Sequence, residues 1–148
     1  KKVGSTEAMK HSAATSPGWG AWLGTAPVDA RETERAVLER DFEKLADVAE
    51  ANCLLMHSTT MTARPPILYF QGQTLNLFRR IRALRAKGHG CFFSADAGPN
   101  VMVFTLPGEW EAIAASIHDE YPELRILNLK AGGGLRYEAP SEETEGHR

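Results

Sequence analysis

Apolar residues recur every three or four positions through most of the first 88 residues, a spacing that predicts amphipathic helices. The longest series begins after Asp41 and ends between His57 and Met61, with the polar Asn52 on its apolar face. A second series predicts a helix over residues 73–87, closed by Gly88. Shorter helices are predicted over 7–15, 19–23 and 30–40, with a loop at 24–27 and Asp29 as the N-cap of the last.

The pattern changes to a period of two after residue 88, which predicts strands. The predicted strands cover residues 91–93, 101–106, 124–129 and 135–137, and a helix over 109–119 lies between the second and third. Helices followed by neighbouring strands indicate an α+β fold, with the ferredoxin-like arrangement of helices packed on one face of a mainly antiparallel sheet. We expect one domain over 1–138 and a disordered acidic tail over 139–148, which has no large apolar residue.

Composition narrows the classes of function. The chain has 148 residues, 43% of them hydrophobic, and a formal net charge of −2. Such a charge gives no long-range attraction for a polyanion, so we expect no nucleic-acid partner. The apolar runs are too short for a membrane span, and the cysteines Cys53 and Cys91 suit buried thiols in a reducing compartment, so we expect a cytoplasmic protein with no membrane partner. The histidines and cysteines show no metal-ligand spacing, so no metal site is predicted. Because the first residue is not Met, we expect a fragment of something longer.

The segment Asp96-Ala97-Gly98-Pro99-Asn100 between two predicted strands is the sharpest local feature. Gly98 can adopt a positive φ and Pro99 fixes the following backbone, so the turn should be rigid. Asp96 would emerge where a strand leaves the core, with the amides of Ala97 and Gly98 free to face a ligand oxygen. The alternative is an Asx turn in which Asp96 bonds only to its own backbone.

Ser5 and Thr6 begin the first predicted helix. Free N–H groups at a helix start, together with a hydroxyl, can bind a phosphate without bulk positive charge. The alternative is that Ser5 or Thr6 is a plain N-cap, and the two roles are compatible. His57 lies beside three hydroxyl residues, but adjacent helix positions point in different directions, so we interpret it as a histidine at a helix end.

Several short motifs occur in one order along the chain: Gly4-Ser5-Thr6-Glu7-Ala8-Met9, Thr15-Ser16, Asn52 with Met56-His57, Pro65-Pro66-Ile67-Leu68-Tyr69, and Asp96-Ala97-Gly98-Pro99-Asn100. From Val3 to about Glu138 the chain thereby resembles the C-terminal half of the mevalonate diphosphate decarboxylase family, within the GHMP kinase superfamily. The last motif is the most specific. The superfamily's kinases have a glycine-rich loop without this Asp, so the resemblance favours a decarboxylase.

The resemblance implies an ATP- and Mg²⁺-dependent conversion of mevalonate 5-diphosphate to isopentenyl diphosphate in isoprenoid biosynthesis. Asp96 matches the family's catalytic aspartate, which contacts the 3-hydroxyl. A carboxylic acid is far more acidic than a tertiary alcohol, so it would orient the hydroxyl and accept its proton only as phosphoryl transfer develops. Ser5 matches a serine near the substrate or nucleotide phosphates, Met9 would line the same pocket, and Ala97 and Gly98 would contact the substrate.

The family's glycine-rich ATP loop and its substrate-binding Arg and Lys residues belong to an N-terminal half that precedes this segment. The resemblance therefore implies that ATP and Mg²⁺ bind mainly there, that this chain is inactive alone, and that its partners are an N-terminal GHMP domain and a second copy in a homodimer. Thr6 departs from members that carry Arg there. The alternatives are a related GHMP enzyme acting on mevalonate or mevalonate phosphate, or a non-catalytic α+β ligand-binding or assembly domain.

Overall fold

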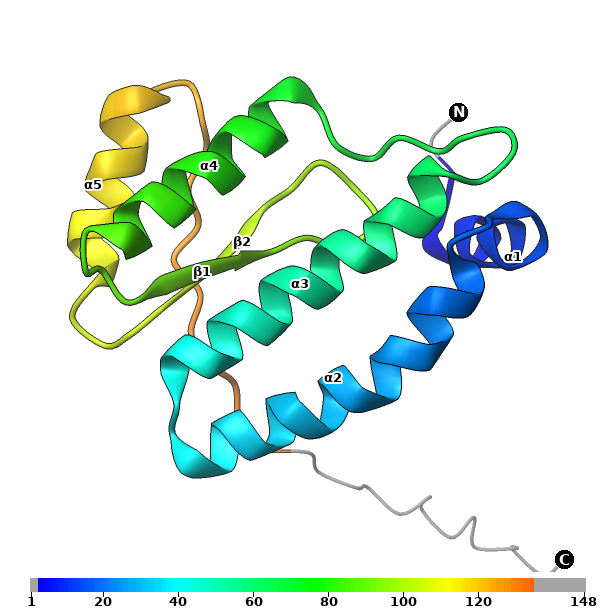
Figure 1. Ribbon diagram of the computed structural model, residues 1–148. Helices are drawn as coiled ribbons and strands as arrows, with labels where there is room; N and C mark the ends of the chain where they lie inside the picture. Colours follow the sequence, from blue (N-terminus) through cyan, green and yellow to red (C-terminus); the bar gives the residue numbers. More distant parts are fainter. Residues whose placement is uncertain (1–2, 135–148) are drawn as a thin grey trace, which may run out of the picture.

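A computed structural model describes residues 3–134, in which helices are followed by a small sheet and a last helix (Figure 1). Within this range the elements are α1 (Ser5–Thr15), α2 (Trp19–Glu39), α3 (Phe42–Met61), α4 (Gly72–Ala86), β1 (Cys91–Ser94), β2 (Met102–Thr105) and α5 (Trp110–Glu120). The two strands are antiparallel, with Phe92 opposite Phe104 and Phe93 opposite Val103. The predicted α+β class is confirmed.

The helices cover one face of the sheet. On that face Phe93 stacks on Phe78 of α4, with ring centroids 3.8 Å apart, and Cys91 is fully buried. The opposite face remains partly open, since Met102 and Phe104 of β2 are 43% and 41% exposed. The main core forms between α3, α4, β1 and α5; its buried members are Cys53, Phe78, Ile81, Leu84, Cys91, Phe93, Ala95, Ile113 and Ile117. This core continues past the end of β1 to Ala95, so it supports the turn that follows.

The predicted loop at 24–27 is wrong, because α2 continues through Pro27 as one helix. A proline inside a helix removes one backbone hydrogen bond and can cost about 3 kcal/mol. Here α2 packs along α3, and this contact offsets the loss. Asp29, predicted as an N-cap, instead accepts a 2.8 Å hydrogen bond from the Asn52 side chain, which explains the polar residue on the apolar face of α3.

The predicted strand over 124–129 is also wrong. This segment is extended, and Leu124 and Ile126 pack against the core, but within residues 3–134 it pairs with neither strand. The alternation came from contact with the core on one side only, and alternation alone does not supply a pairing edge. The predicted strand over 135–137 and the tail over 139–148 lie outside the described residues. No helix in the described part of the chain is long and apolar enough to cross a membrane.

Candidate functional site

The Asp96 side chain stands at the point where the backbone leaves the core. Ala95, directly after β1, is buried, whereas Asp96 is exposed at the next position. Successive side chains of an extended segment point to opposite sides, so burying Ala95 directs the Asp96 carboxylate outward. Among residues 3–134 this carboxylate forms no hydrogen bond or ion pair, so the Asx turn weighed as an alternative is not formed.

The turn after Asp96 is closed by the backbone. The N–H of Gly98 donates to the main-chain oxygen of Asp96 at 2.7 Å, a bond between residues two apart. The prediction of a free Gly98 amide is therefore wrong. Gly98 does not use the positive φ that is open to glycine, because within the described range the glycines with positive φ are Gly88 and Gly108. Pro99 and this short bond shape the turn, and the Ala97 amide keeps no backbone partner in residues 3–134.

Two buried side chains fix the ends of the turn. The carbonyl oxygen of Ala95 accepts a 3.0 Å hydrogen bond from Nε2 of His57, which is 1% exposed. At the other end, the carbonyl oxygen of Pro99 accepts a 3.1 Å hydrogen bond from the hydroxyl of Thr74, which is 2% exposed. Helices α3 and α4 thus each hold one end of the turn, as a positioned carboxylate requires.

The roles of His57 and Thr74 were not predicted from the sequence. The available signal was a polar residue on a predicted apolar face, since His57 follows Cys53 by four positions. Burial lowers the pKa of His57, and the hydrogen bond to Ala95 and the nearby Asp96 charge oppose this shift. A carbonyl oxygen can only accept, so Nε2 carries the proton of this imidazole.

Ser5 is the first residue of α1, and Gly4 is its N-cap. The prediction that Ser5 or Thr6 caps the helix is wrong, because the cap forms no side-chain hydrogen bond. Instead the first helical bond runs from the N–H of Ala8 to the Gly4 oxygen, so the preceding N–H groups have no partner within the helix. Both Ser5 and Met9, one turn later, are exposed, while Glu7 adds a negative charge to the first turn.

A series of contacts connects the start of α1 with the turn at Asp96. The Tyr69 hydroxyl donates to the Val3 oxygen at 3.0 Å, and the Tyr69 ring meets the His57 ring edge-on with centroids 6.0 Å apart. His57 in turn holds Ala95. Figure 1 shows α1 beside the end of α3, where His57 lies. The predicted phosphate-binding and carboxylate groups are therefore linked through one buried histidine.

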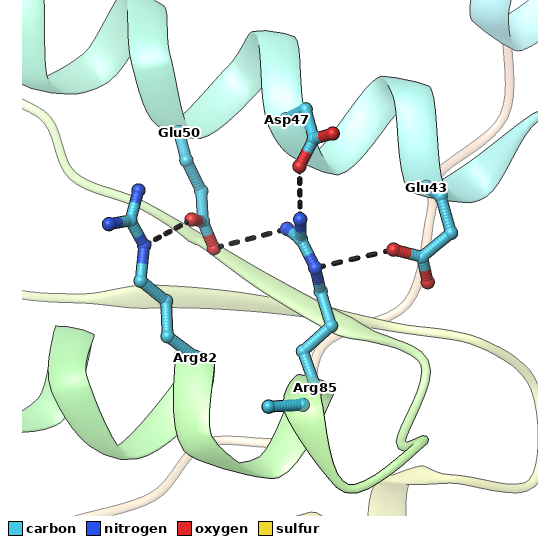
Figure 2. A pocket seen from close by; sticks show the side chains of 6 residues that line it. Glu43, Asp47, Glu50, Arg82 and Arg85 are labelled. Carbon is cyan, nitrogen blue, oxygen red and sulfur yellow. Dashed lines mark hydrogen bonds and ion pairs between the residues drawn. The ribbon is translucent and has the colours of Figure 1, made fainter.

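A separate pocket of about 530 Å³ lies between α3 and α4, lined by Glu43, Asp47, Glu50, Arg82, Arg85 and Ala86 (Figure 2). None of the predicted site residues lines it. Its charged groups pair with one another, as between Arg82 Nε and Glu50 Oε2 at 2.8 Å. Across the described range, no group of three or more His, Cys, Asp or Glu residues is arranged to hold a metal ion.

Comparison with known proteins connects this geometry to a family. A family model described as the mevalonate 5-diphosphate decarboxylase C-terminal domain matches residues 1–143. The human diphosphomevalonate decarboxylase is 30% identical over 127 residues, which cover 82% of this chain and 31% of the human protein. A phosphomevalonate decarboxylase from Haloferax volcanii is 28% identical over 85 residues, or 57% of this chain and 26% of that protein.

Solved structures agree with the sequence matches. The mevalonate diphosphate decarboxylase from Enterococcus faecalis has a TM-score of 0.76 and 35% identity, covering 80% of this chain and 37% of that one. The mevalonate pyrophosphate decarboxylase from Streptococcus pyogenes has a TM-score of 0.78 and 34% identity, and the match covers 82% of this chain and 39% of that one. The chain thus spans about a third of the length of the relatives it matches.

Proposed function

The chain belongs to the mevalonate 5-diphosphate decarboxylase family as its C-terminal domain, and from this premise we propose that it contributes Asp96 to the ATP-dependent decarboxylation of mevalonate 5-diphosphate. The products would be isopentenyl diphosphate, ADP, phosphate and carbon dioxide. The observation that carries the proposal is an exposed carboxylate on a turn fixed at both ends by buried side chains. The Enterococcus faecalis relative supports it, since its ATP binding is described as mediated by mevalonate diphosphate.

Asp96 would act on the tertiary hydroxyl of the substrate. Its exposed carboxylate accepts a hydrogen bond from that hydroxyl and orients the oxygen for phosphoryl transfer. A carboxylate is too weak a base to remove the proton beforehand, so it takes the proton as the new oxygen–phosphorus bond forms. When the new phosphate leaves with its bonding electrons, the substrate carboxylate loses carbon dioxide and the double bond forms.

The start of α1 would contact phosphate groups. The unpartnered N–H groups of its first turn and the positive end of the helix dipole favour an anion. The Ser5 hydroxyl adds a donor there, with Met9 and Ala97 as further substrate contacts. Gly98 contributes backbone shape only, because its N–H is already bonded.

ATP and Mg²⁺ are proposed to bind mainly to an N-terminal GHMP domain paired with this chain, in keeping with the lack of a metal-ligand group in residues 3–134. A related structure is described as MDDEF in complex with MVAPP, AMPPCP and Magnesium.

We further propose a homodimer in the cytoplasm. Cys53 and Cys91 are buried free thiols, which suits a reducing compartment.

The test is Asp96→Asn in the complete enzyme, meaning this chain together with the N-terminal half. We expect kcat to fall by at least about 10³-fold, because the hydroxyl loses its proton acceptor, with little change in melting temperature. Phosphate release and isopentenyl diphosphate formation measure the effect. Asp119→Asn, a change at an exposed acid of α5, is the matched control and should keep normal turnover. Full activity of Asp96→Asn would refute the proposal.

A second candidate is decarboxylation of mevalonate monophosphate, which the Haloferax volcanii match favours. The first turn of α1 also carries Thr6 and the acidic Glu7, so its side chains supply no positive charge for a diphosphate. Measuring kcat/KM of the complete enzyme with each substrate separates the two. A preference for the monophosphate would replace the diphosphate as substrate and leave the role of Asp96 unchanged.

A further inference from the structure

We propose that His57 is a positioning residue for Asp96: its imidazole sets the direction of the catalytic carboxylate by holding the peptide that precedes it. This inference rests on the proposed function and deepens it. His57 touches no reacting atom in the proposal, because its ring is buried and its bonded nitrogen faces the protein backbone.

The hydrogen bond of His57 acts directly on the peptide that carries Asp96. His57 Nε2 donates at 3.0 Å to the carbonyl oxygen of Ala95, which belongs to the peptide joining Ala95 to Asp96. Rotation of that peptide changes the direction of the Asp96 side chain. The same oxygen receives only a long, weak contact from the Cys53 thiol at 3.6 Å, so His57 is the stronger of its two donors.

The imidazole itself is held from several sides. The centroid of its ring lies 4.1 Å from the centroid of the Phe70 ring, and the Tyr69 ring meets it edge-on. Burial favours the neutral ring, and the bond to Ala95 selects the form with hydrogen on Nε2. Because the ring is fixed in position and in protonation state, its hydrogen bond can hold the Ala95 peptide in one orientation.

A second consequence follows from Tyr69. This residue donates to the Val3 oxygen, two positions before Ser5, while its ring contacts His57. His57 therefore lies between the segment that presents Asp96 and the segment that presents the first turn of α1. An ordinary core histidine would fill space in one place, whereas this one contacts both segments of the proposed site.

The experiment compares two amide replacements in the complete enzyme. The amide nitrogen of Gln occupies nearly the place of Nε2, whereas that of Asn corresponds to Nδ1 and does not reach Ala95. We expect His57→Asn to lower kcat by about 10- to 100-fold with KM changed less than about threefold, as for a misdirected catalytic group. His57→Gln should retain kcat within about threefold. Melting temperatures of both variants check folding.

Asp96→Asn and the double variant Asp96→Asn/His57→Asn complete a cycle. If His57 acts through Asp96, the double variant is no slower than Asp96→Asn alone. Independent, multiplicative losses overturn the positioning role, and so does wild-type kcat in a folded His57→Asn. If either of these results occurs while Asp96→Asn has a low kcat, only the positioning role of His57 fails and the proposed function stands. An active Asp96→Asn refutes the proposed function itself.

A measurement on the wild-type enzyme covers the case in which His57→Asn does not fold. Nitrogen-15 spectra of labelled histidine, assigned with His57→Gln, report which ring nitrogen carries hydrogen. We expect the Nε2-H form of His57 to persist between pH 6 and 8, together with a coupling across the hydrogen bond to Ala95. A His57 ring protonated on Nδ1 alone would overturn the inference.

Discussion

At the residue scale, the site depends on a change of environment across one peptide bond. Ala95 is buried and its carbonyl is bonded to His57, while the next side chain, Asp96, is exposed. A polar group buried without a partner would be costly, so the carbonyl and the imidazole each satisfy the other. The same bond therefore contributes to stability and to the direction of the carboxylate.

The burial of His57 predicts a pH dependence of stability. Its pKa in the folded protein is below the ordinary value of 6.5, so below about pH 6.5 the unfolded chain binds a proton that the folded chain does not. The free energy of unfolding should fall as the pH drops from 6.5 to the folded pKa, by at most about 1.4 kcal/mol per pH unit, and then level off. Denaturant unfolding at pH 5 to 8 measures this.

His57→Gln is the comparison for that measurement, because it removes the titrating ring and keeps the donor. Its stability should depend less on pH than that of the wild type. His118→Gln, at an exposed position of α5, should keep the wild-type profile. If the stability of the wild type and of His57→Gln depended on pH in the same way, the His57 ring would titrate equally in the folded and the unfolded chain.

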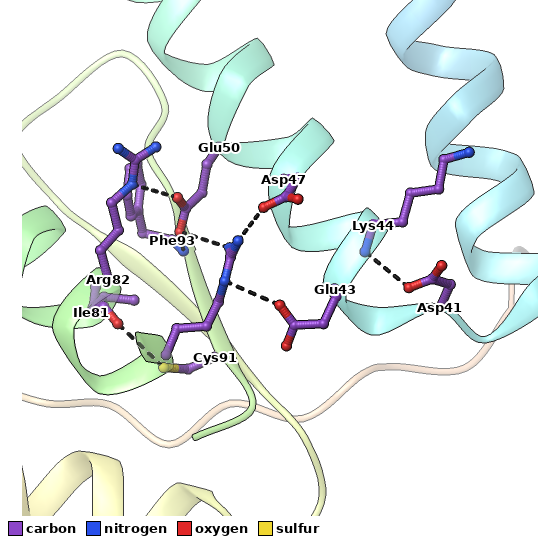
Figure 3. Close-up of polar contacts among 10 residues, drawn as sticks. Asp41, Glu43, Lys44, Asp47, Glu50, Ile81, Arg82, Cys91 and Phe93 are labelled. Atoms are coloured by element: carbon purple, nitrogen blue, oxygen red, sulfur yellow. Dashed lines mark hydrogen bonds and ion pairs between the residues drawn. The ribbon is translucent and has the colours of Figure 1, made fainter. Parts of the chain in front are cut away.

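At the scale of elements, Glu50 joins α3 to α4 and to β1 (Figure 3). Its carboxylate accepts hydrogen bonds from Arg82 Nε at 2.8 Å and from the Phe93 N–H at 3.4 Å. Arg85 Nη1 lies 3.7 Å from Glu50 Oε1. The Phe93 N–H lies on the edge of β1 away from β2, so the Glu50 side chain covers an edge that no strand of residues 3–134 pairs with. Glu43, in contrast, pairs with Arg85 at 3.3 Å from an exposed position.

These environments predict different costs for the two glutamates. Glu50→Ala should lower the free energy of unfolding by about 3 kcal/mol, because it leaves a buried N–H and the paired arginines without this acceptor. Glu43→Ala should cost less than about 1 kcal/mol, because the ion pair it removes is solvated. Urea unfolding of the chain measures both. Equal costs would mean that the burial of Glu50 adds nothing to stability.

At the scale of the whole molecule, the chain corresponds to about a third of its relatives. The helices cover one sheet face, and Met102 and Phe104 leave the other partly open. Within residues 3–134 most of the predicted site residues are exposed and Gly98 is half-buried, whereas the pocket between α3 and α4 lies among paired charges. The proposed active site would therefore need a second domain to exclude water.

We accordingly predict that the chain alone releases no phosphate from ATP in the presence of mevalonate 5-diphosphate, and that adding the N-terminal half restores turnover. The reason is that the described residues offer a positioned acid and a helix start but no metal-ligand group. Phosphate release from each half and from the mixture tests this. Turnover by the chain alone, unaffected by Asp96→Asn in a parallel assay, would point to a contaminating activity.

The sequence by itself determined the elements whose pattern is local. The apolar spacing predicted α3 and α4, and the alternation predicted the strands around residue 91. The cluster of turn-forming residues after Asp96 predicted the turn. The motif at 96–100 also pointed to the family before any contact was known. Such features depend on residues close together in the chain.

Tertiary structure decided whatever depends on partners distant in sequence. Packing on α3 keeps α2 helical through Pro27. Within the described residues the segment 124–129 packs on the core without pairing with β1 or β2, so it stays outside the sheet. His57 is 38 positions from Ala95 and Thr74 is 25 from Pro99, so no local pattern shows that they hold the turn. Periodicity states which face of an element is buried, and only folding determines which groups meet there.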